Sequence, residues 1–270
     1  MRALMWFLPV VALLLPQLAF AQIQPHRAEY ALRLGAAANA ARVGSAVQDL
    51  TLACDGWRLK RDVKGEIALS ATWKMDLASK LDAEEPRAGD AFRFTTLQVQ
   101  NGAERETHGK VQRAGNELKA QIVSPSGPAQ FVLPSPTLMP VALIDHVVER
   151  LRSGAAGFPV LVFDAEGTGE TFVIDVKPAD PATIRGRRPA DKPVAVPGKS
   201  WPVFMSFMRS HDQPRQHKPL FTISAQLFDS GVLDRLTVET PMATVTADLL
   251  ALEMHKPPSC PPPSVPTKGF

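Results

Sequence analysis

The sequence predicts an all-β fold, in which an antiparallel sheet is accompanied by one amphipathic helix. Apolar and polar residues alternate with a period of two in many short segments, as they do when one sheet face is packed and the other is wet. The 25 prolines also favour strands and turns, because proline cannot donate a hydrogen bond inside a helix or a central ladder. Helical periodicity breaks the pattern in one segment.

The first 21 residues predict a cleavable export signal. Arg2 gives a positive start, an apolar run extends from Ala3 to Leu15, and residues 19–21 show the small-x-small pattern of a cleavage site. The run is too short for a confident membrane span, which takes about 20 residues. We therefore expect a periplasmic protein that begins at Gln22 and has no transmembrane segment, with a membrane anchor as the alternative.

Residues 22–260 are expected to form one domain, followed by an extended, proline-rich tail over residues 261–270. Hydrophobic residues make up 45% of the chain, which is ample for a core. Lys and Arg number 30 against 27 Asp and Glu. This balance argues against a nucleic-acid partner, which would require a concentrated basic surface.

The chain contains two cysteines, Cys54 and Cys260. In an exported protein such a pair favours one disulfide, and closing so long a loop stabilises the fold by roughly 5 kcal/mol as an upper limit. Two free thiols or a redox pair are the alternatives. Neither cysteine has another close in sequence, so a thioredoxin-like motif is absent.

Alternation predicts strands along most of the chain. The turn Asp-Ser-Gly at residues 229–231 is a hairpin signal, and Thr-Pro at residues 240–241 separates the next pair of strands. The predicted strands cover residues 27–34, 47–53, 57–63, 67–75, 92–99, 117–123, 158–163, 171–176, 220–228, 232–238 and 242–252.

One amphipathic helix is predicted over residues 138–151, with Gly154 as its stop signal. We expect it to plug or cover one end of a curved sheet. Residues 177–200 have no period and are rich in Pro, Gly, Arg and Lys, which predicts a loop. The apolar residues that recur at spacings of three and four are Leu138, Val141, Leu143, Ile144, Val147, Val148 and Leu151.

No motif in the sequence predicts catalysis or a resident cofactor. The Gly-Lys-Ser triplet at residues 198–200 resembles the end of a phosphate-binding loop, but Pro193 occupies the place of the first glycine. A Gly-x-Ser-x-Gly elbow is absent. The acid pair Glu84-Glu85 precedes Pro86 and is expected in a loop. We therefore expect no enzymatic activity and no cofactor.

Two groups of residues are weak candidates for metal ligands. Asp145, His146 and Glu149 lie within about one turn of the predicted helix, but no matching further ligands are visible, and a polar helix face explains them. Residues 211–217 hold His, Asp and His in a loop, where solvent exposure is again the simpler explanation. A run of basic residues is likewise expected to lie in a solvated loop. The alternative is that it contacts anionic lipid head groups. The run consists of Arg185, Arg187, Arg188 and Lys192.

The sharpest local feature is the sequence Cys-Asp-Gly-Trp at residues 54–57, a turn that sends a large indole into the core. Together with residues 26–32, it resembles the EipB family of periplasmic cell-envelope integrity proteins of alphaproteobacteria. The resemblance spans nearly the whole mature chain. Its further segments follow in the expected order: residues 133–137, 162–167, 201–203 and 220–231, and then Cys260.

The resemblance implies a β-spiral, an open and strongly curved antiparallel sheet that is similar to an incomplete barrel. It also implies a disulfide between Cys54 and Cys260 and a groove that accepts a peptide or an apolar ligand. Asp55, Gly56, Trp57 and Trp201 would be structural residues rather than catalytic ones.

Family resemblance further implies support of envelope integrity without enzymatic activity, and a periplasmic tetratricopeptide-repeat protein as a partner. The chain departs from the family in one respect. Aromatic residues are common in the family strand before the Cys-Asp-Gly-Trp turn, whereas residues 47–53 contain none and Tyr30 is the only tyrosine.

Three hypotheses remain. The preferred one is a non-catalytic envelope protein that binds a protein or peptide partner in or near its groove. The alternative is a carrier of lipid or lipoprotein acyl chains, which requires a continuous apolar cavity because each buried methylene contributes about 0.8 kcal/mol. The third is an enzyme with a scattered site, which would gather His108, His146 or His211 with carboxylates.

Overall fold

The computed structural model describes residues 23–68, 74–166, 171–189, 191–210 and 218–260. Within these residues, fifteen strands form a single sheet in the order β8-β7-β6-β5-β4-β3-β2-β1-β15-β14-β13-β12-β11-β10-β9. All neighbours are antiparallel except β9 and β10, which are parallel. The predicted all-β fold with one helix is therefore confirmed.

Most elements follow one another along the chain with short connections, whereas a long one joins Pro178 to Ser200. One α-helix and one 3₁₀ helix accompany the strands in the described part of the chain. The elements are β1 His26–Leu34, β2 Arg42–Leu52, β3 Gly56–Ala68, β4 Lys74–Pro86, β5 Ala91–Gln100, β6 Ala103–Ala114, β7 Glu117–Ser124, β8 Gly127–Leu133, β9 Thr137–Leu138, α1 Pro140–Arg152, β10 Phe158–Phe163, β11 Thr171–Pro178, the 3₁₀ helix Pro181–Thr183, β12 Ser200–Arg209, β13 Phe221–Phe228, β14 Leu233–Glu239 and β15 Thr244–Met254.

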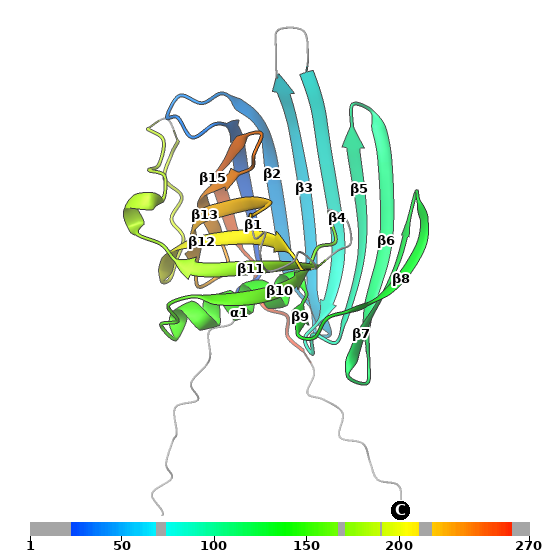
Figure 1. The fold of residues 1–270 in the computed structure, drawn as a ribbon. Helices are drawn as coiled ribbons and strands as arrows, with labels where there is room; N and C mark the ends of the chain where they lie inside the picture. The colour runs from blue at the N-terminus through cyan, green and yellow to red at the C-terminus, as the bar shows by residue number, and fades with distance from the viewer. Residues whose placement is uncertain (1–22, 69–73, 167–170, 190, 211–217, 261–270) are drawn as a thin grey trace, which may run out of the picture.

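The sheet curls until its two ends approach each other. Figure 1 shows β2 to β8 as one tall wall, with β10 to β13 running across it and α1 at one end. Phe92 and Phe94 of β5 meet Phe163 of β10, with ring centroids 6.1 and 5.7 Å apart, although β5 and β10 are far apart in the strand order. The nearly closed, barrel-like sheet agrees with the expected β-spiral.

Alternation places the core on the inner face of the sheet. Along β5, Phe92 and Phe94 are buried, whereas Arg93 between them is exposed. Along β6, Val111 is buried and Lys110 is exposed. Successive side chains of a strand point to opposite faces, so each strand contributes apolar residues to the interior and polar residues to the outside.

Helix α1 lies at one end of the curled sheet (Figure 1) and buries Val141, Val147, Val148 and Leu151. It ends at Arg152, and Gly154 follows with a φ of 79°, a left-handed conformation that favours glycine. The predicted helix and its stop signal are confirmed, as is its position at the end of the sheet.

Several predicted boundaries are wrong. The single strand predicted over residues 67–75 does not exist, because Ile67 at the end of β3 pairs with Met75 at the start of β4. Strands β4, β6, β8, β9 and β12 were not predicted. Most of β6 is exposed on both faces, so its sequence carries no alternation. The loop predicted over residues 177–200 is largely confirmed, although its ends belong to β11 and β12.

Three of the four residues of the basic run inside that loop form ion pairs with the sheet, whereas the fourth, Lys192, is exposed as expected. We call residues 184–189 and Asp191 the arginine strap. Arg185 and Arg188 both contact the carboxylate of Asp248 on β15, and Arg187 contacts Asp234 on β14. The expectation of a solvated loop is therefore wrong for these three arginines, whose acidic partners lie 47 to 63 residues further along the chain.

Arg188 is the most buried of these arginines, with a side chain that is 2% exposed. Its guanidinium also donates to the hydroxyl of Thr246 at 2.9 Å and to the carbonyl of Gly35 at 3.3 Å. Arg33 of β1 adds an ion pair of 2.8 Å with Asp191. The strap is thus fixed to β1, β14 and β15 by buried charge pairs.

The structure contains the Cys54–Cys260 disulfide, with Cα atoms 5.5 Å apart. Gly56 lies where a Cβ atom would stand 2.4 Å from the carbonyl oxygen of Glu85, so a larger residue would collide with β4. Asp55 is exposed and accepts a hydrogen bond of 2.9 Å from Arg58. Trp57 and Trp201 are half-buried and pack against the core.

Candidate functional site

The curled sheet encloses a cavity of about 330 Å³ between α1 and the inner face of the strands. Almost all of its lining is apolar, and the side chains come from β4, α1 and β10 to β14. Inward-facing positions of the strands and one face of α1 create this lining. The apolar lining residues are Leu81, Pro140, Leu143, Ile144, Val147, Val162, Phe163, Ala165, Phe172, Ile174, Met205, Phe207, Phe221, Ile223, Leu227, Gly231 and Leu233.

A short polar edge borders this cavity. Arg61 of β3 forms an ion pair with Glu166, which follows β10, and donates a second hydrogen bond of 2.9 Å to Gln48 of β2. Gln98 of β5 donates to the backbone carbonyl of Glu166. Asp164 accepts a hydrogen bond of 3.0 Å from the Glu166 amide. The polar edge therefore offers fixed hydrogen-bonding groups beside a large apolar surface.

Glu85 of β4 holds the N-terminus of α1. Its two carboxylate oxygens accept hydrogen bonds from the amides of Val141 and Ala142, at 2.9 and 2.8 Å. Met139, at the N-cap position, supplies no side-chain cap, so a carboxylate from the sheet satisfies the first turn. The expectation that Glu84 and Glu85 lie in a loop is wrong.

Burial raises the pKa of Glu85 to about 7, although the two amide hydrogen bonds act in the opposite direction. The side chain is 3% exposed. Since Leu143, Ile144 and Val147 of α1 form one wall of the cavity, the Glu85 carboxylate also fixes the position of that wall.

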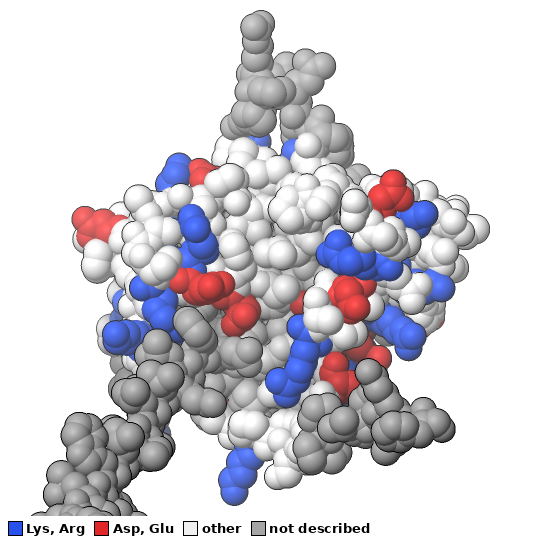
Figure 2. Space-filling view, turned by 90° about the horizontal axis from the view of Figure 1, so that it is seen from below, with Lys and Arg blue, Asp and Glu red and all other residues white. Residues whose placement is uncertain are grey.

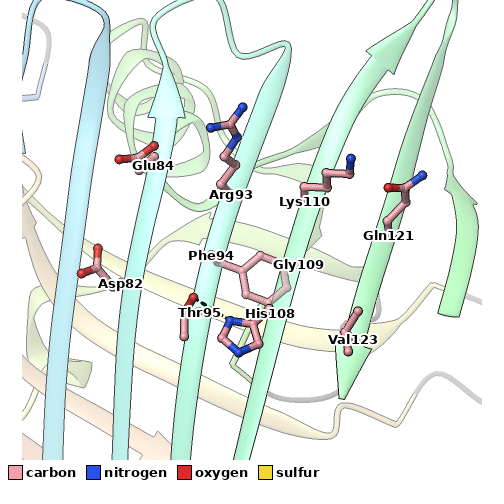
Figure 3. A pocket seen from close by; sticks show the side chains of 10 residues that line it. All are labelled: Asp82, Glu84, Arg93, Phe94, Thr95, His108, Gly109, Lys110, Gln121 and Val123. Carbon is pink, nitrogen blue, oxygen red and sulfur yellow. Dashed lines mark hydrogen bonds between the residues drawn. The ribbon is translucent and has the colours of Figure 1, made fainter. Parts of the chain in front are cut away.

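A second, shallower hollow of about 730 Å³ lies on the outer face of β4 to β7. Figure 3 shows its side chains in two rows that cross the strands. Strand register places Glu84, Arg93, Lys110 and Gln121 next to one another in the upper row. The lower row contains Asp82, Thr95, His108 and Val123.

The residues considered as metal ligands are not brought together. Asp145 accepts a hydrogen bond of 3.3 Å from the Ile23 amide, and the His146 ring meets the edge of Phe158 at 5.8 Å. Across the described ranges, no group of three His, Cys, Asp or Glu side chains is placed to hold a metal ion. The second group, at residues 211–217, lies outside the described residues, as do the export signal and the tail after Cys260.

The three histidines of the scattered-site hypothesis do not form a described cluster. His108 lies on the outer face of β6, where its ring contacts the Thr95 hydroxyl at 3.1 Å, whereas His146 is on α1. His211 is outside the described residues. The structure therefore does not bring His108 and His146 together in one site.

Sequence reasoning missed both Glu85 and the outer row of cations. Leu81, Ala83 and Glu85 share the inner face of β4, so the period-two pattern contained a signal for a buried carboxylate. The pairing of Arg93 with Lys110 depends on the register of β5 and β6. Because β6 was not predicted, that register had no sequence signal.

The surface has mixed charge where it is shown in Figure 2. On this face Lys and Arg side chains lie next to Asp and Glu side chains rather than in separate areas. None of the helices in the described residues combines the length and the apolar character needed to span a membrane.

A family model for EipB-like proteins matches residues 17–256. The chain belongs to the EipB-like family. Among solved structures, this EipB-like protein is similar to a beta-barrel-like protein of the domain of unknown function DUF1849 from Brucella abortus. The TM-score is 0.71 at 17% identity, and the match covers 87% of this chain and 99% of that one. This structural similarity shows a shared fold. A comparison with curated proteins finds no significant match.

Proposed function

We propose that this EipB-like protein is exported to the periplasm, where it supports cell-envelope integrity by binding a protein or peptide partner in or near its groove. The observation that carries the proposal is the apolar cavity beneath α1, with its polar edge at Arg61 and Glu166. Binding sites usually combine apolar walls with a few fixed polar groups. Apolar side chains of a partner would occupy the cavity, and its backbone would reach the polar edge.

Two features support export. The sequence begins with a pattern typical of a secretory signal, and the Cys54–Cys260 disulfide suits an oxidising compartment. On family grounds, the partner we expect is a periplasmic tetratricopeptide-repeat protein. The proposal assigns binding and no catalytic step to this chain.

A second candidate function is the transport of lipid or lipoprotein acyl chains. It is favoured by the lining of the cavity, which consists almost entirely of Leu, Ile, Val, Phe, Met and other apolar residues. A volume of about 330 Å³ lies at the lower end of the range of small-molecule sites, roughly 300–1,000 Å³. In this case the polar edge would contact the head of the ligand.

Filling the cavity tests both candidates. Met205 lines the cavity, so Met205→Trp replaces a flexible thioether side chain with a bulkier indole that fills part of the space. Met242 is 94% exposed, and Met242→Trp is the matched control. Wild type and both variants are purified from the periplasm, and co-purifying peptides, proteins and lipids are quantified by mass spectrometry.

We expect Met205→Trp to lower the recovery of one protein or peptide by about tenfold or more, a change of roughly 1.4 kcal/mol, and Met242→Trp to leave it unchanged. Loss of a bound phospholipid or acylated peptide in Met205→Trp alone would favour the carrier instead. If both tryptophan variants retain every ligand that wild type retains, the cavity is not the binding site.

A further inference from the structure

The outer hollow on β4 to β7 differs in charge between its two sides. On the β4 side, Asp82 and Glu84 are neutralised by cations of β3. Lys60 approaches Asp82 at 3.4 Å, and Arg58 approaches Glu84 at 3.1 Å. These carboxylates therefore already have partners across the strand pair.

On the other side of the hollow, two cations stand directly opposite each other. Arg93 of β5 pairs in register with Lys110 of β6, and both side chains are exposed on the outer face. Neither forms an ion pair or a side-chain hydrogen bond within the described residues. Like charges opposite each other in a sheet destabilise it. Glu84 lies opposite Arg93 on the other side, but its carboxylate is paired with Arg58.

Uncharged hydrogen-bonding groups continue the same row. Gln121 of β7 lies opposite Lys110, and Gln130 of β8 lies opposite Gln121. One row below, the Thr95 hydroxyl and the His108 ring contact each other at 3.1 Å. Figure 3 shows Arg93, Lys110 and Gln121 side by side at one end of the hollow. Two cations and an amide thus line one side of the hollow, whose volume is about 730 Å³.

We propose that this hollow binds a phosphate-type anion, either a phosphomonoester or a phosphodiester, between Arg93 and Lys110, with Gln121 as an additional donor. The guanidinium donates a planar pair of hydrogen bonds that matches phosphate oxygens. The ammonium adds a compact positive charge. A bound anion would turn the repulsion between the two cations into attraction to a shared partner. The site lies on the opposite face of the sheet from the cavity beneath α1, so it does not depend on the function proposed for that cavity.

The test measures binding of inorganic phosphate by NMR, with ionic strength held constant by sodium chloride. The signals to follow are the Arg93 Nε–H and the Gln121 side-chain amide, which report on the site itself. The test variant is Arg93→Gln/Lys110→Gln. The control is Lys64→Gln/Lys74→Gln, which removes the same charge from exposed lysines of β3 and β4 outside the hollow.

We expect phosphate to shift both signals in wild type and in the control. The test variant is expected to bind phosphate about tenfold or more weakly, because two charge-assisted hydrogen-bonding partners are lost. Circular dichroism and a melting curve confirm that the variants are folded. Unchanged phosphate affinity in the test variant, an equal loss in the control, or no binding by wild type would overturn the proposal.

A second arm identifies the source of the phosphate group. Wild type and both variants are mixed with vesicles of equal parts phosphatidylglycerol and phosphatidylcholine, and with vesicles of phosphatidylcholine alone. Binding to the anionic vesicles that is lost only in Arg93→Gln/Lys110→Gln supports a lipid head group. Phosphate binding at Arg93 and Lys110 without vesicle binding supports a free phosphate ester.

Discussion

Helix α1 and the arginine strap both leave the sheet and pack back onto it, but different forces hold them. The helix buries an apolar face against the interior and uses one carboxylate, Glu85, at its N-terminus. The strap is fixed by ion pairs, with Arg188 and Arg185 on Asp248 and Arg187 on Asp234.

This difference predicts how each segment responds to change. Apolar contacts are non-directional, so α1 can adjust when the cavity beside it is filled. A buried ion pair depends on both partners, because removal of one leaves an uncompensated charge. The strap is therefore the more sensitive to single substitutions, and the attachment of α1 is the more sensitive to pH.

The largest effect is expected from Arg188→Met. The substitution removes one of the two cations on buried Asp248, which keeps Arg185, and also removes the hydrogen bonds to Thr246 and Gly35. The combined loss is expected to cost about 3–5 kcal/mol. Arg105→Met on the exposed part of β6 is the matched control. Urea unfolding measures the free energy of each variant. Equal stability of the two variants would contradict the role given to the strap.

Cys54→Ser is expected to follow. Loss of a native disulfide typically costs about 2–5 kcal/mol, and this one joins residues 206 positions apart. Thermal melts with and without a reductant measure the effect. Wild type and variant should differ in oxidising buffer and should agree once wild type is reduced. A variant that melts like wild type in oxidising buffer would show that the disulfide adds no stability.

The smallest effect is a pH dependence that comes from Glu85. The pKa of Glu85 is about 7 in the folded protein, against an ordinary value of 4.5 for an exposed glutamate. The folded state therefore binds the proton more tightly than the unfolded chain does. The contribution of Glu85 to the free energy of unfolding should therefore fall by about 3 kcal/mol as pH rises from about 4.5 to above 7.

Glu85→Gln should remove this fall, whereas Glu84→Gln should keep it, because Glu84 lies on the outer face beside Arg58. Urea unfolding of the three proteins at a series of pH values measures the slopes. Equal slopes in wild type and Glu85→Gln would mean that Glu85 titrates at its ordinary pKa.

Local sequence signals predicted a large part of the fold. The Asp-Ser-Gly turn at residues 229–231 does connect β13 to β14, and Gly231 has the positive φ of 87° that the turn requires. The spacing of apolar residues identified α1, and the count of cysteines identified the disulfide. Each of these signals depends on neighbouring residues or on composition.

The parts that sequence reasoning missed depend on distant residues. Arg188 looks like a residue of a solvated loop until β15 supplies Asp248. Glu85 looks like a surface acid until α1 places two amides against it. The cavity itself is formed by residues from Arg61 to Leu233, which only the curl of the sheet brings together.

We propose that the cavity beneath α1 supports envelope integrity. Its most direct test replaces the chromosomal copy in the source organism with wild type, Met205→Trp or Met242→Trp, expressed to equal levels, and measures survival in detergent. We predict that wild type and Met242→Trp restore full survival to a deletion strain and that Met205→Trp does not. Full rescue by Met205→Trp, with the cavity filled, would contradict the claim.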